Sequence, residues 1–257
     1  MKPFAHTFAV ASAAALVVVA PAHAEGWNVI VTPYFMAPNM DGKAGLGKLE
    51  TQVSQSPSDI FSNLNWGVMG SVEVNNGNWG VNFDVNYMNL DLTPKDITRL
   101  SVTGHQAAYT ATILKRIHEN AWVYIGARYS DMGVQFGCQS NCLPNGGINL
   151  PNGGANIPAI DTKRNKSWGE PLAGFRAELP FNDKFDLTFT ADVGGFGQGS
   201  EVSVNVWPQL GIRLGGTSKA MIGYRLIYVK HESEDDGRAF VYDVLTFGPT
   251  AGLEFRF

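Results

Sequence analysis

Charged residues alternate with apolar ones in several segments of this chain, and their types suit ion pairing. Carboxylates and arginines occupy such positions, and lysines do not. They are Glu73, Asp84, Glu170, Glu178, Asp186, Asp192 and Glu254, with Arg128, Arg176, Arg213, Arg225 and Arg256. The planar guanidinium group forms two parallel hydrogen bonds to a carboxylate even where little water is present. The pattern predicts a partly buried network of arginine and carboxylate side chains.

The lysines follow a different pattern. Beyond residue 24, each one falls in or beside a predicted loop or turn: Lys43, Lys48, Lys95, Lys115, Lys163, Lys166, Lys184, Lys219 and Lys230. The lysine ammonium group is compact and strongly hydrated, so it prefers contact with water. We therefore expect no lysine in the network.

Two groups of residues have the composition of a hydrolytic site. One comprises His231, Glu232, Asp235 and Asp236 in a predicted loop. The other comprises Ser101, His105 and Tyr109 on one face of a predicted strand, a face that also carries Ala107, Ala111 and Ile113 and is therefore apolar. A histidine beside carboxylates can activate water, but a serine–histidine hydrolase also needs a third group that orients the histidine. Neither group supplies it, so we predict no enzymatic activity and no cofactor.

Two cysteines, Cys138 and Cys142, lie four residues apart in a long polar segment. In an exported protein such a pair forms a disulfide by default. A metal site would need further ligands, and no histidine or cysteine recurs nearby. We therefore predict a disulfide and no metal.

The elements that position these residues are long strands with a period of two. From Trp79, one face carries Trp79, Val81, Phe83, Val85 and Tyr87, and the other carries Gly80, Asn82, Asp84, Asn86 and Met88. The same alternation recurs at 185–193 and 202–214. An apolar face opposite a polar face, over lengths of about 9 to 11 residues or more, is typical of strands that cross a membrane as a barrel.

The links between strands alternate between short polar turns and longer segments, as in a barrel with short turns at one end and loops at the other. This predicts ten strands, at 27–36, 64–75, 79–92, 100–115, 121–136, 166–180, 185–196, 201–214, 219–231 and 240–257. Within residues 37–63, the segment 42–54 either extends the first hairpin or packs as a lid. Eight or twelve strands therefore stay open as alternatives, and the fold class is an all-β, closed, antiparallel, up-and-down transmembrane barrel.

Counted from the predicted turns, the charged residues fall at two heights in such a barrel. Asp84, Arg128, Arg176, Asp192 and Arg225 come near the middle. Glu178, Asp186, Arg213, Glu254 and Arg256 come lower. Ten strands enclose far less space than the 16 to 18 that leave a wide channel. We therefore expect the charges to close a narrow lumen, with a small ion or solute path as the alternative.

The first residues have the pattern of an export signal. Lys2 precedes an apolar run from Phe8 to Ala20, and Ala22-His23-Ala24 has the small-residue spacing of a cleavage site. We predict a signal peptide at 1–24 and one barrel domain at 25–257. Without Lys2, 18 basic side chains face 23 acidic ones, a net charge of −5 that gives no support to nucleic-acid binding.

The chain ends on a strictly alternating strand with a terminal phenylalanine. The segment Thr250-Ala251-Gly252-Leu253-Glu254-Phe255-Arg256-Phe257 resembles the C-terminal signal of Gram-negative outer-membrane proteins. In that pattern the signal residues are Thr250, Gly252, Leu253, Phe255 and Phe257. The resemblance implies recognition by the barrel-assembly machinery. A soluble antiparallel sandwich that ends on an ordinary strand is the alternative.

The segment from "TPYFMAPNMDGKAG" to "SPSDIFSNLNWGVMGSVEVNNGNWGVNFDVNYMNLDL" also resembles small barrels related to the membrane domains of OmpA and OmpW, a group with no assigned activity. The resemblance implies a location in the outer membrane, in contact with its lipid. We therefore expect a structural or surface-interaction role, with the loop at 137–165 available to an extracellular partner. The alternatives are a narrow channel and a barrel that binds a small solute. An enzyme would bring a histidine and its carboxylate or hydroxyl partner together at one rim.

Overall fold

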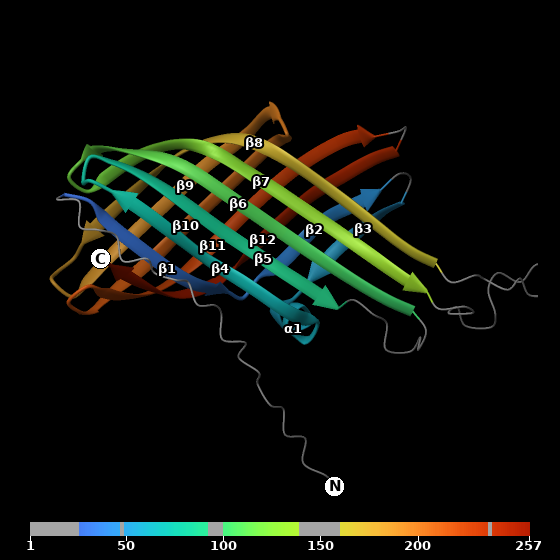
Figure 1. Ribbon diagram of the computed structural model, residues 1–257, viewed down its shortest axis with the longest axis horizontal. Helices are drawn as coiled ribbons and strands as arrows, with labels where there is room; N and C mark the ends of the chain where they lie inside the picture. The colour runs from blue at the N-terminus through green and yellow to red at the C-terminus, as the bar shows by residue number, and fades with distance from the viewer. Residues whose placement is uncertain (1–25, 47–48, 92–99, 139–159, 236–237) are drawn as a thin grey trace, which may run out of the picture.

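The computed structural model describes residues 26–46, 49–91, 100–138, 160–235 and 238–257, and every structural statement below concerns these residues. They form one antiparallel sheet of twelve strands that closes into a cylinder (Figure 1). The signal peptide predicted at 1–24, Cys142 and most of the segment 137–165 lie outside the described residues. The single described helix, α1, is not long and apolar enough to cross a bilayer.

The strands are long and follow one another around the wall. Their bounds are β1 Asn28–Met36, β2 Asn39–Leu46, β3 Leu49–Gln55, β4 Leu64–Asn75, β5 Trp79–Asp91, β6 Leu100–His118, β7 Ala121–Cys138, β8 Ile160–Pro180, β9 Phe185–Gln198, β10 Ser200–Gly215, β11 Ser218–Asp235 and β12 Arg238–Arg256, with helix α1 at Pro57–Ser62. Their order in the sheet is β1, β4 to β12 in sequence, then β2 and β3. Pairing between β1 and β12 closes the ring, so ten strands make the barrel.

Closure depends on the two ends of the chain. Val31 of β1 lies opposite Phe255 of β12, and the last residue, Phe257, both donates to and accepts from the backbone of Val29. In lipid an unpaired strand edge leaves backbone polar groups without partners, so the last strand must pair with the first. The prediction of a closed antiparallel barrel of ten strands is confirmed.

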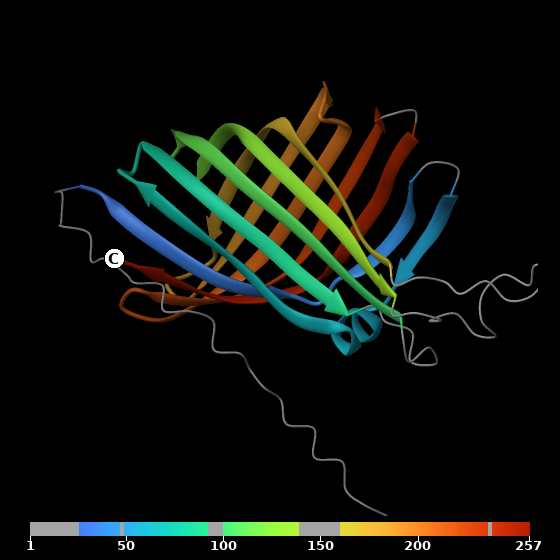
Figure 2. The ribbon, with the colours of Figure 1, turned by 45° about the vertical axis from the view of Figure 1, so that its right-hand side comes forward.

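The strand β2 continues β1 along the same edge of β12. Met36 lies opposite Thr250 and Asn39 lies opposite Phe247, so the register is unchanged across the interruption at Ala37 and Pro38. The strand β3 then pairs with β2 as a hairpin. The segment at 42–54 thus extends the first hairpin and is not a lid (Figure 2).

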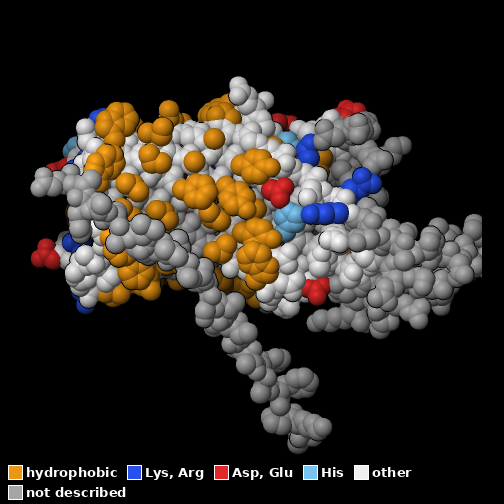
Figure 3. Space-filling view, viewed as in Figure 1, with side chains coloured by type: hydrophobic (Ala, Val, Ile, Leu, Met, Phe, Trp, Pro, Cys, Tyr) orange, Lys and Arg blue, Asp and Glu red, His pale blue; other side chains and the backbone are white. Residues whose placement is uncertain are grey.

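The outer face of the barrel is apolar. Side chains that alternate outward from the strands include Phe83 at 47% exposure, Ile125 at 66% and Ile222 at 56%. Figure 3 shows apolar side chains spread over the wall, with charged side chains mostly toward its ends. Exposed apolar surface on this scale is stable in lipid and not in water. The chain is a transmembrane β-barrel of the outer-membrane type.

Several strands run further than the sequence pattern predicted. The strand β8 begins at Ile160, where a loop was expected to continue to 165, and β11 extends to Asp235. The ladder between β7 and β8 continues to Cys138 and Ile160. Where strands extend beyond the lipid, both faces of the sheet carry polar residues, so apolar and polar residues no longer alternate. The sequence pattern therefore ends earlier along the strand than the hydrogen-bonded pairing does.

The link between β9 and β10 is also tighter than predicted. A loose connection was expected at 194–200, but only Gly199 separates the two strands. Gly199 has φ +75°, and a Cβ atom there would collide with the carbonyl oxygen of Gly169 on β8. Glycine is needed both for this backbone conformation and for the close contact.

Candidate functional site: the charged lumen and its apolar cap

The lumen has two ends, which differ in the length of the links between strands. The turn end carries the short turns, such as 76–78 between β4 and β5, and the C-terminus. The loop end carries the links that follow β5, β7 and β11. Because strand residues alternate between faces, each strand sends one set of side chains into the lumen and the other set outward. Toward the turn end, the inward set is mostly polar and the outward set is mostly apolar.

Arg128 on β7 is the centre of a buried group at mid-barrel. Its Nη2 donates to Asp192 Oδ1 at 2.6 Å, and its Nη1 donates to Glu170 Oε1 at 3.1 Å. The hydroxyl of Ser203 donates to the same oxygen of Glu170. The side chains of Arg128, Asp192 and Glu170 are 6%, 5% and 1% exposed. A buried charge is tolerated only with such partners.

Arg225 on β11 forms a second buried group at the same level. Its Nη1 donates to the hydroxyl of Tyr34 at 2.8 Å, and that hydroxyl in turn donates to Asp84 Oδ2 at 3.0 Å. Its Nε donates to Asn205 Oδ1 at 2.9 Å, and its guanidinium lies 4.4 Å from the ring centre of Trp207. Arg128 and Arg225, with their carboxylate partners, form what we call the middle layer.

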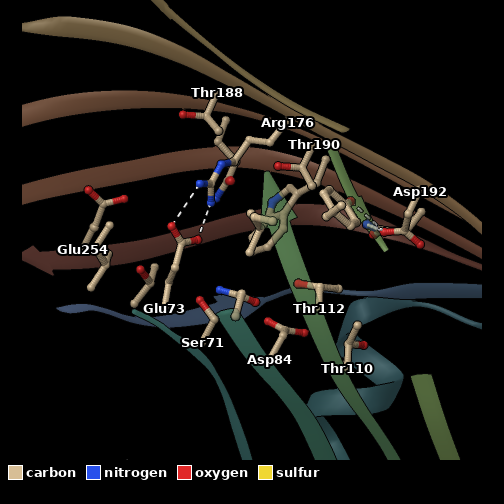
Figure 4. Close-up of a pocket in the computed structure, with 18 of the residues that line it drawn as sticks. Ser71, Glu73, Asp84, Thr110, Thr112, Arg176, Thr188, Thr190, Asp192 and Glu254 are labelled. Atoms are coloured by element: carbon tan, nitrogen blue, oxygen red, sulfur yellow. Dashed lines mark hydrogen bonds and ion pairs between the residues drawn. The ribbon is translucent and has the colours of Figure 1, made fainter. Parts of the chain in front are cut away.

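Arg176 on β8 spans the lumen closer to the turn end. Its two terminal nitrogens contact both oxygens of Glu73 on β4, at 2.6 and 3.0 Å (Figure 4). Its Nε lies 3.5 Å from Glu178 Oε1. The sequence count placed Arg176 with the mid-barrel charges, but its partner Glu178 belongs to the lower set, and Glu73 had been assigned to neither height. A long side chain reaches a level that a count of backbone positions does not give.

One lysine is part of this lower set, contrary to the expectation of none. Lys219 is 6% exposed, and its Nζ lies 3.3 Å from Asp186 Oδ1 and 3.5 Å from Glu254 Oε2. It is the second residue of β11, close to the turn at 216–217, but its backbone position points its side chain inward. Lys219, Arg176 and their carboxylates form what we call the lower layer.

The lower layer is open to water at the turn end. The side chains of Arg213 and Arg256 are 50% and 49% exposed, and they contact Asp186 at 3.9 Å and Glu254 at 2.7 Å. A polar cavity of about 130 Å³ lies between the two layers and is lined by residues of both, among them Glu73, Asp84, Arg128 and Arg176. By the volume that one water needs, it has room for on the order of ten waters.

The loop half of the lumen is apolar. A buried cluster, which we call the apolar cap, consists of Met40, Ile60, Met88, Trp168, Val229, Tyr242 and Val244. The polar atoms of its rings have partners, since Trp168 Nε1 donates to Ser200 Oγ at 2.8 Å and Gln106 Nε2 donates to Tyr242 at 3.2 Å. A cavity of about 50 Å³ separates the cap from the middle layer. No feature of the sequence singled out this cluster, because its members come from five separate strands and one helix.

The first candidate catalytic group does not converge. His231 is buried, stacks on Trp168 with 4.3 Å between ring centres, and its Nδ1 donates to the carbonyl oxygen of Gly199. Glu232 follows on the opposite face of β11 and contacts Lys230 at 3.3 Å. Neighbouring strand residues point to opposite faces, so a cluster in sequence is divided in space. Asp236 lies outside the described residues.

The second candidate group is on the outer face, where its histidine has a carboxylate partner that the sequence did not single out. His105 Nε2 lies 2.8 Å from Asp131 Oδ2 on the neighbouring strand β7. The hydroxyl of Ser101, however, donates to the carbonyl oxygen of Gly137 at 3.2 Å and does not contact His105. The pair lies on the wall, outside the lumen. Cross-strand neighbours such as Asp131 become visible only once the register is known.

The residues of the C-terminal signal lie along β12 with alternating directions. Leu253 and Phe257 face outward with 43% and 50% exposure. Thr250 points inward, where its hydroxyl accepts a hydrogen bond from Trp207 Nε1 at 3.0 Å. The described residues contain no group of side chains that could hold a metal ion.

No protein-family model and no curated protein sequence matches this chain. Among solved structures, the outer-membrane protease OmpT from Escherichia coli has a TM-score of 0.49 at 9% identity, over 90% of this chain and 96% of that one. Ail, the attachment invasion locus protein of Yersinia pestis, has a TM-score of 0.40 at 12% identity, over 91% and 99%. A FadL homologue of Pseudomonas aeruginosa has a TM-score of 0.40 at 7% identity, over 90% of each chain. These similarities concern the barrel architecture, and no activity of those proteins is transferred to this one.

Proposed function

We propose that this protein is a non-enzymatic outer-membrane barrel with an occluded lumen and a structural or surface-interaction role. The single observation that carries the proposal is that two groups of side chains, the middle layer and the apolar cap, fill the lumen one after the other along its axis. The paired charges of the middle layer span the interior at Arg128 and Arg225, and the apolar cap lies directly beyond them. A hydrated ion would have to separate buried ion pairs and then cross an apolar block, and both steps are costly.

The proposal places the turn end in the periplasm and the loop end outside the cell. Water then reaches the lower layer from the periplasm, where Arg213 and Arg256 are half exposed, and stops at the middle layer. Outer-membrane barrels carry their short turns in the periplasm, which supports this orientation. The strands β6, β7, β8, β11 and β12 extend the wall at the loop end, and the segment 137–165 would be the surface that meets a partner.

A liposome-swelling assay tests the occlusion. Vesicles that contain the refolded full-length protein are diluted into an isotonic solution of a small sugar, and their light scattering is followed. Protein-free vesicles set the baseline. We expect the same rate as the baseline, and a swelling rate that rises with the amount of folded barrel would contradict the proposal.

A narrow channel is the second candidate, and the polar cavity of about 130 Å³ between the two layers favours it. This cavity is long enough in the lumen to serve as part of a path, and a small displacement of Arg225, which lines it, would extend the path toward the loop end. If this function is correct, the unaltered protein conducts ions steadily, and Arg225→Ala changes the ion selectivity without changing the stability.

A further inference from the structure

The ladder of hydrogen bonds between β1 and β4 stops within the sheet. The strands β1 and β4 pair from Asn28 and Asn75 as far as Pro33 and Gly70. Proline has no N–H group, so it ends a ladder. Beyond it, the described residues 34–36 of β1 and 64–69 of β4 have no pairing with each other. We call this slit in the wall the seam.

The short helix α1 fills the seam. Ile60 is 3% exposed and belongs to the apolar cap inside the lumen. Phe61, the next residue, faces outward at 37% exposure and stacks on Phe35 of β1, with 5.2 Å between ring centres. A single turn of helix thus contacts the lumen on one side and the lipid-facing wall on the other.

Residues 57–62 are held to the wall by apolar contacts, because their described hydrogen bonds stay within residues 56–63. Ser56 and Asp59 form a reciprocal cap at the helix start, and the Asn63 side chain donates to the carbonyl oxygen of Asp59 at 2.9 Å. Hydrogen bonds from the Ser56 side chain and backbone lower the pKa of Asp59. The Asp59 carboxylate is therefore ionised at neutral pH and accepts the hydrogen bonds of the helix N-terminal capping box. Residues 57–62 can therefore move without breaking any described sheet hydrogen bond, provided that Asn63 stays in place, because its carbonyl oxygen accepts from Asp91 N on β5 at 2.7 Å.

The apolar cap has the chemistry of a site for an apolar molecule. Its cavity is lined by Met88, Met132, Trp168 and Tyr242, among other side chains. Methionine side chains adapt to irregular shapes, and the polar ends of both rings already have partners. At about 50 Å³ the cavity is smaller than the roughly 150 Å³ that holds a benzene molecule. Ile60 does not line the cavity itself but belongs to the same buried cluster as Met88 and Trp168, which do. A ligand of that size therefore needs the side chain of Ile60 to leave and these neighbours to shift into its place.

We propose that the apolar cap binds a small apolar molecule, of the size of a benzene derivative, which reaches it sideways from the bilayer when α1 moves out of the seam. Such molecules concentrate in lipid, and the seam opens onto it. The charged middle layer blocks further movement toward the turn end, because Arg128 and Arg225 line the floor of the same cavity. The site binds and does not transport, so it requires no open path and can fail or succeed separately from the proposed function.

The test uses quenching of Trp168 by bromobenzene in the full-length barrel refolded in phospholipid vesicles. The emission of Trp168 is taken as the difference between the unaltered protein and Trp168→Phe. We expect this component to be quenched along a saturating curve and restored by toluene, whereas tryptophans on the outer wall are quenched in proportion to the bromobenzene in the lipid. A strictly proportional response of Trp168, without competition, would overturn the proposal.

Two variants test the route. Ile60→Ala should tighten the apparent binding roughly tenfold, because the ligand no longer has to displace a buried side chain. Ile125→Ala, the same change at an outward position on β7, is the matched control and should leave binding unchanged. An equal effect of both would contradict the role of α1.

A disulfide in the double variant Phe35→Cys/Phe61→Cys then fixes the helix, in a background that carries Cys138→Ser and Cys142→Ser. We expect slow or no binding when the link is formed and recovery after reduction. Undiminished binding to the linked protein would mean that ligands come through the loop end, and the side route would be wrong. Heat-modifiable migration in gels verifies that each variant is folded, and ion conductance measured in parallel tests the occlusion separately.

Discussion

Arg176 on β8 and Glu73 on β4 are joined across the lumen by two hydrogen bonds of 2.6 and 3.0 Å, although 103 residues separate them in sequence. Three strands lie between β4 and β8 along the shorter path around the wall. The pair therefore acts as a strut that connects opposite sides of the barrel. Its side chains are 17% and 3% exposed, so water screens it only in part.

A double-mutant cycle measures this strut. Arg176→Met and Glu73→Gln should each destabilise the barrel, and the double variant should lose less than the sum of the two. We expect a coupling free energy of about 0.5 to 3 kcal/mol, from urea unfolding of the barrel in vesicles. Additive effects would mean that the two charges do not stabilise each other.

Arg128 should be much more sensitive to truncation than Arg213. Arg128→Ala leaves Glu170 and Asp192 buried without their cation, and Glu170 Oε2 already has no hydrogen-bond partner among the described residues. We expect a loss of about 3 to 5 kcal/mol in the free energy of unfolding. Arg213→Ala is the matched control, because this side chain is half exposed, and it should cost about 0 to 1 kcal/mol. Equal losses would contradict the layered description.

The alternation of apolar and polar residues predicted the barrel and the inward direction of the carboxylates and arginines of the network, and the spacing of turns and longer links predicted its ten strands. It could not give the pairing, because Arg176 and Glu73 meet only after four intervening links have set the register. Lys219 was missed for a related reason. Its position beside a turn suggested contact with water. The alternation of side-chain directions along β11, however, points Lys219 inward, toward Asp186 and Glu254.

The sequence-based predictions for residues at the loop end failed for a different reason. His231 and Glu232 are neighbours in sequence, so they suggested one site, yet strand geometry sends them to opposite faces. The partner of His105 was not recognised because Asp131 lies on the next strand, 26 residues away. Residues that come together across strands leave no local signal in a single sequence.

The terminal phenylalanine should govern assembly. Phe257 closes the ring through backbone hydrogen bonds with Val29, and its side chain faces outward at the turn end. Deletion of Phe257, or its replacement by aspartate, should leave export intact and reduce the amount of folded barrel in the outer membrane. Heat-modifiable, protease-protected protein in membrane fractions is the readout. An unchanged yield would count against an assembly role for this residue.

The segment 137–165 should be accessible from outside the cell. Protease added to intact cells should cut there, and maleimide labelling should require prior reduction if Cys138 and Cys142 are paired. Cutting that occurs only after the outer membrane has been permeabilised would reverse the orientation proposed for the barrel. Labelling without reductant would exclude the disulfide.

The most direct measurement of the central claim, an occluded lumen, is the ion current across a planar lipid bilayer that contains the refolded protein. The unaltered barrel should give no steady current at either sign of voltage. The double variant Arg128→Ala/Trp168→Ala, which weakens both the middle layer and the apolar cap, should give discrete current steps and so shows that barrels are inserted. Steady, stepwise conductance of the unaltered protein would contradict the occluded lumen and favour the channel.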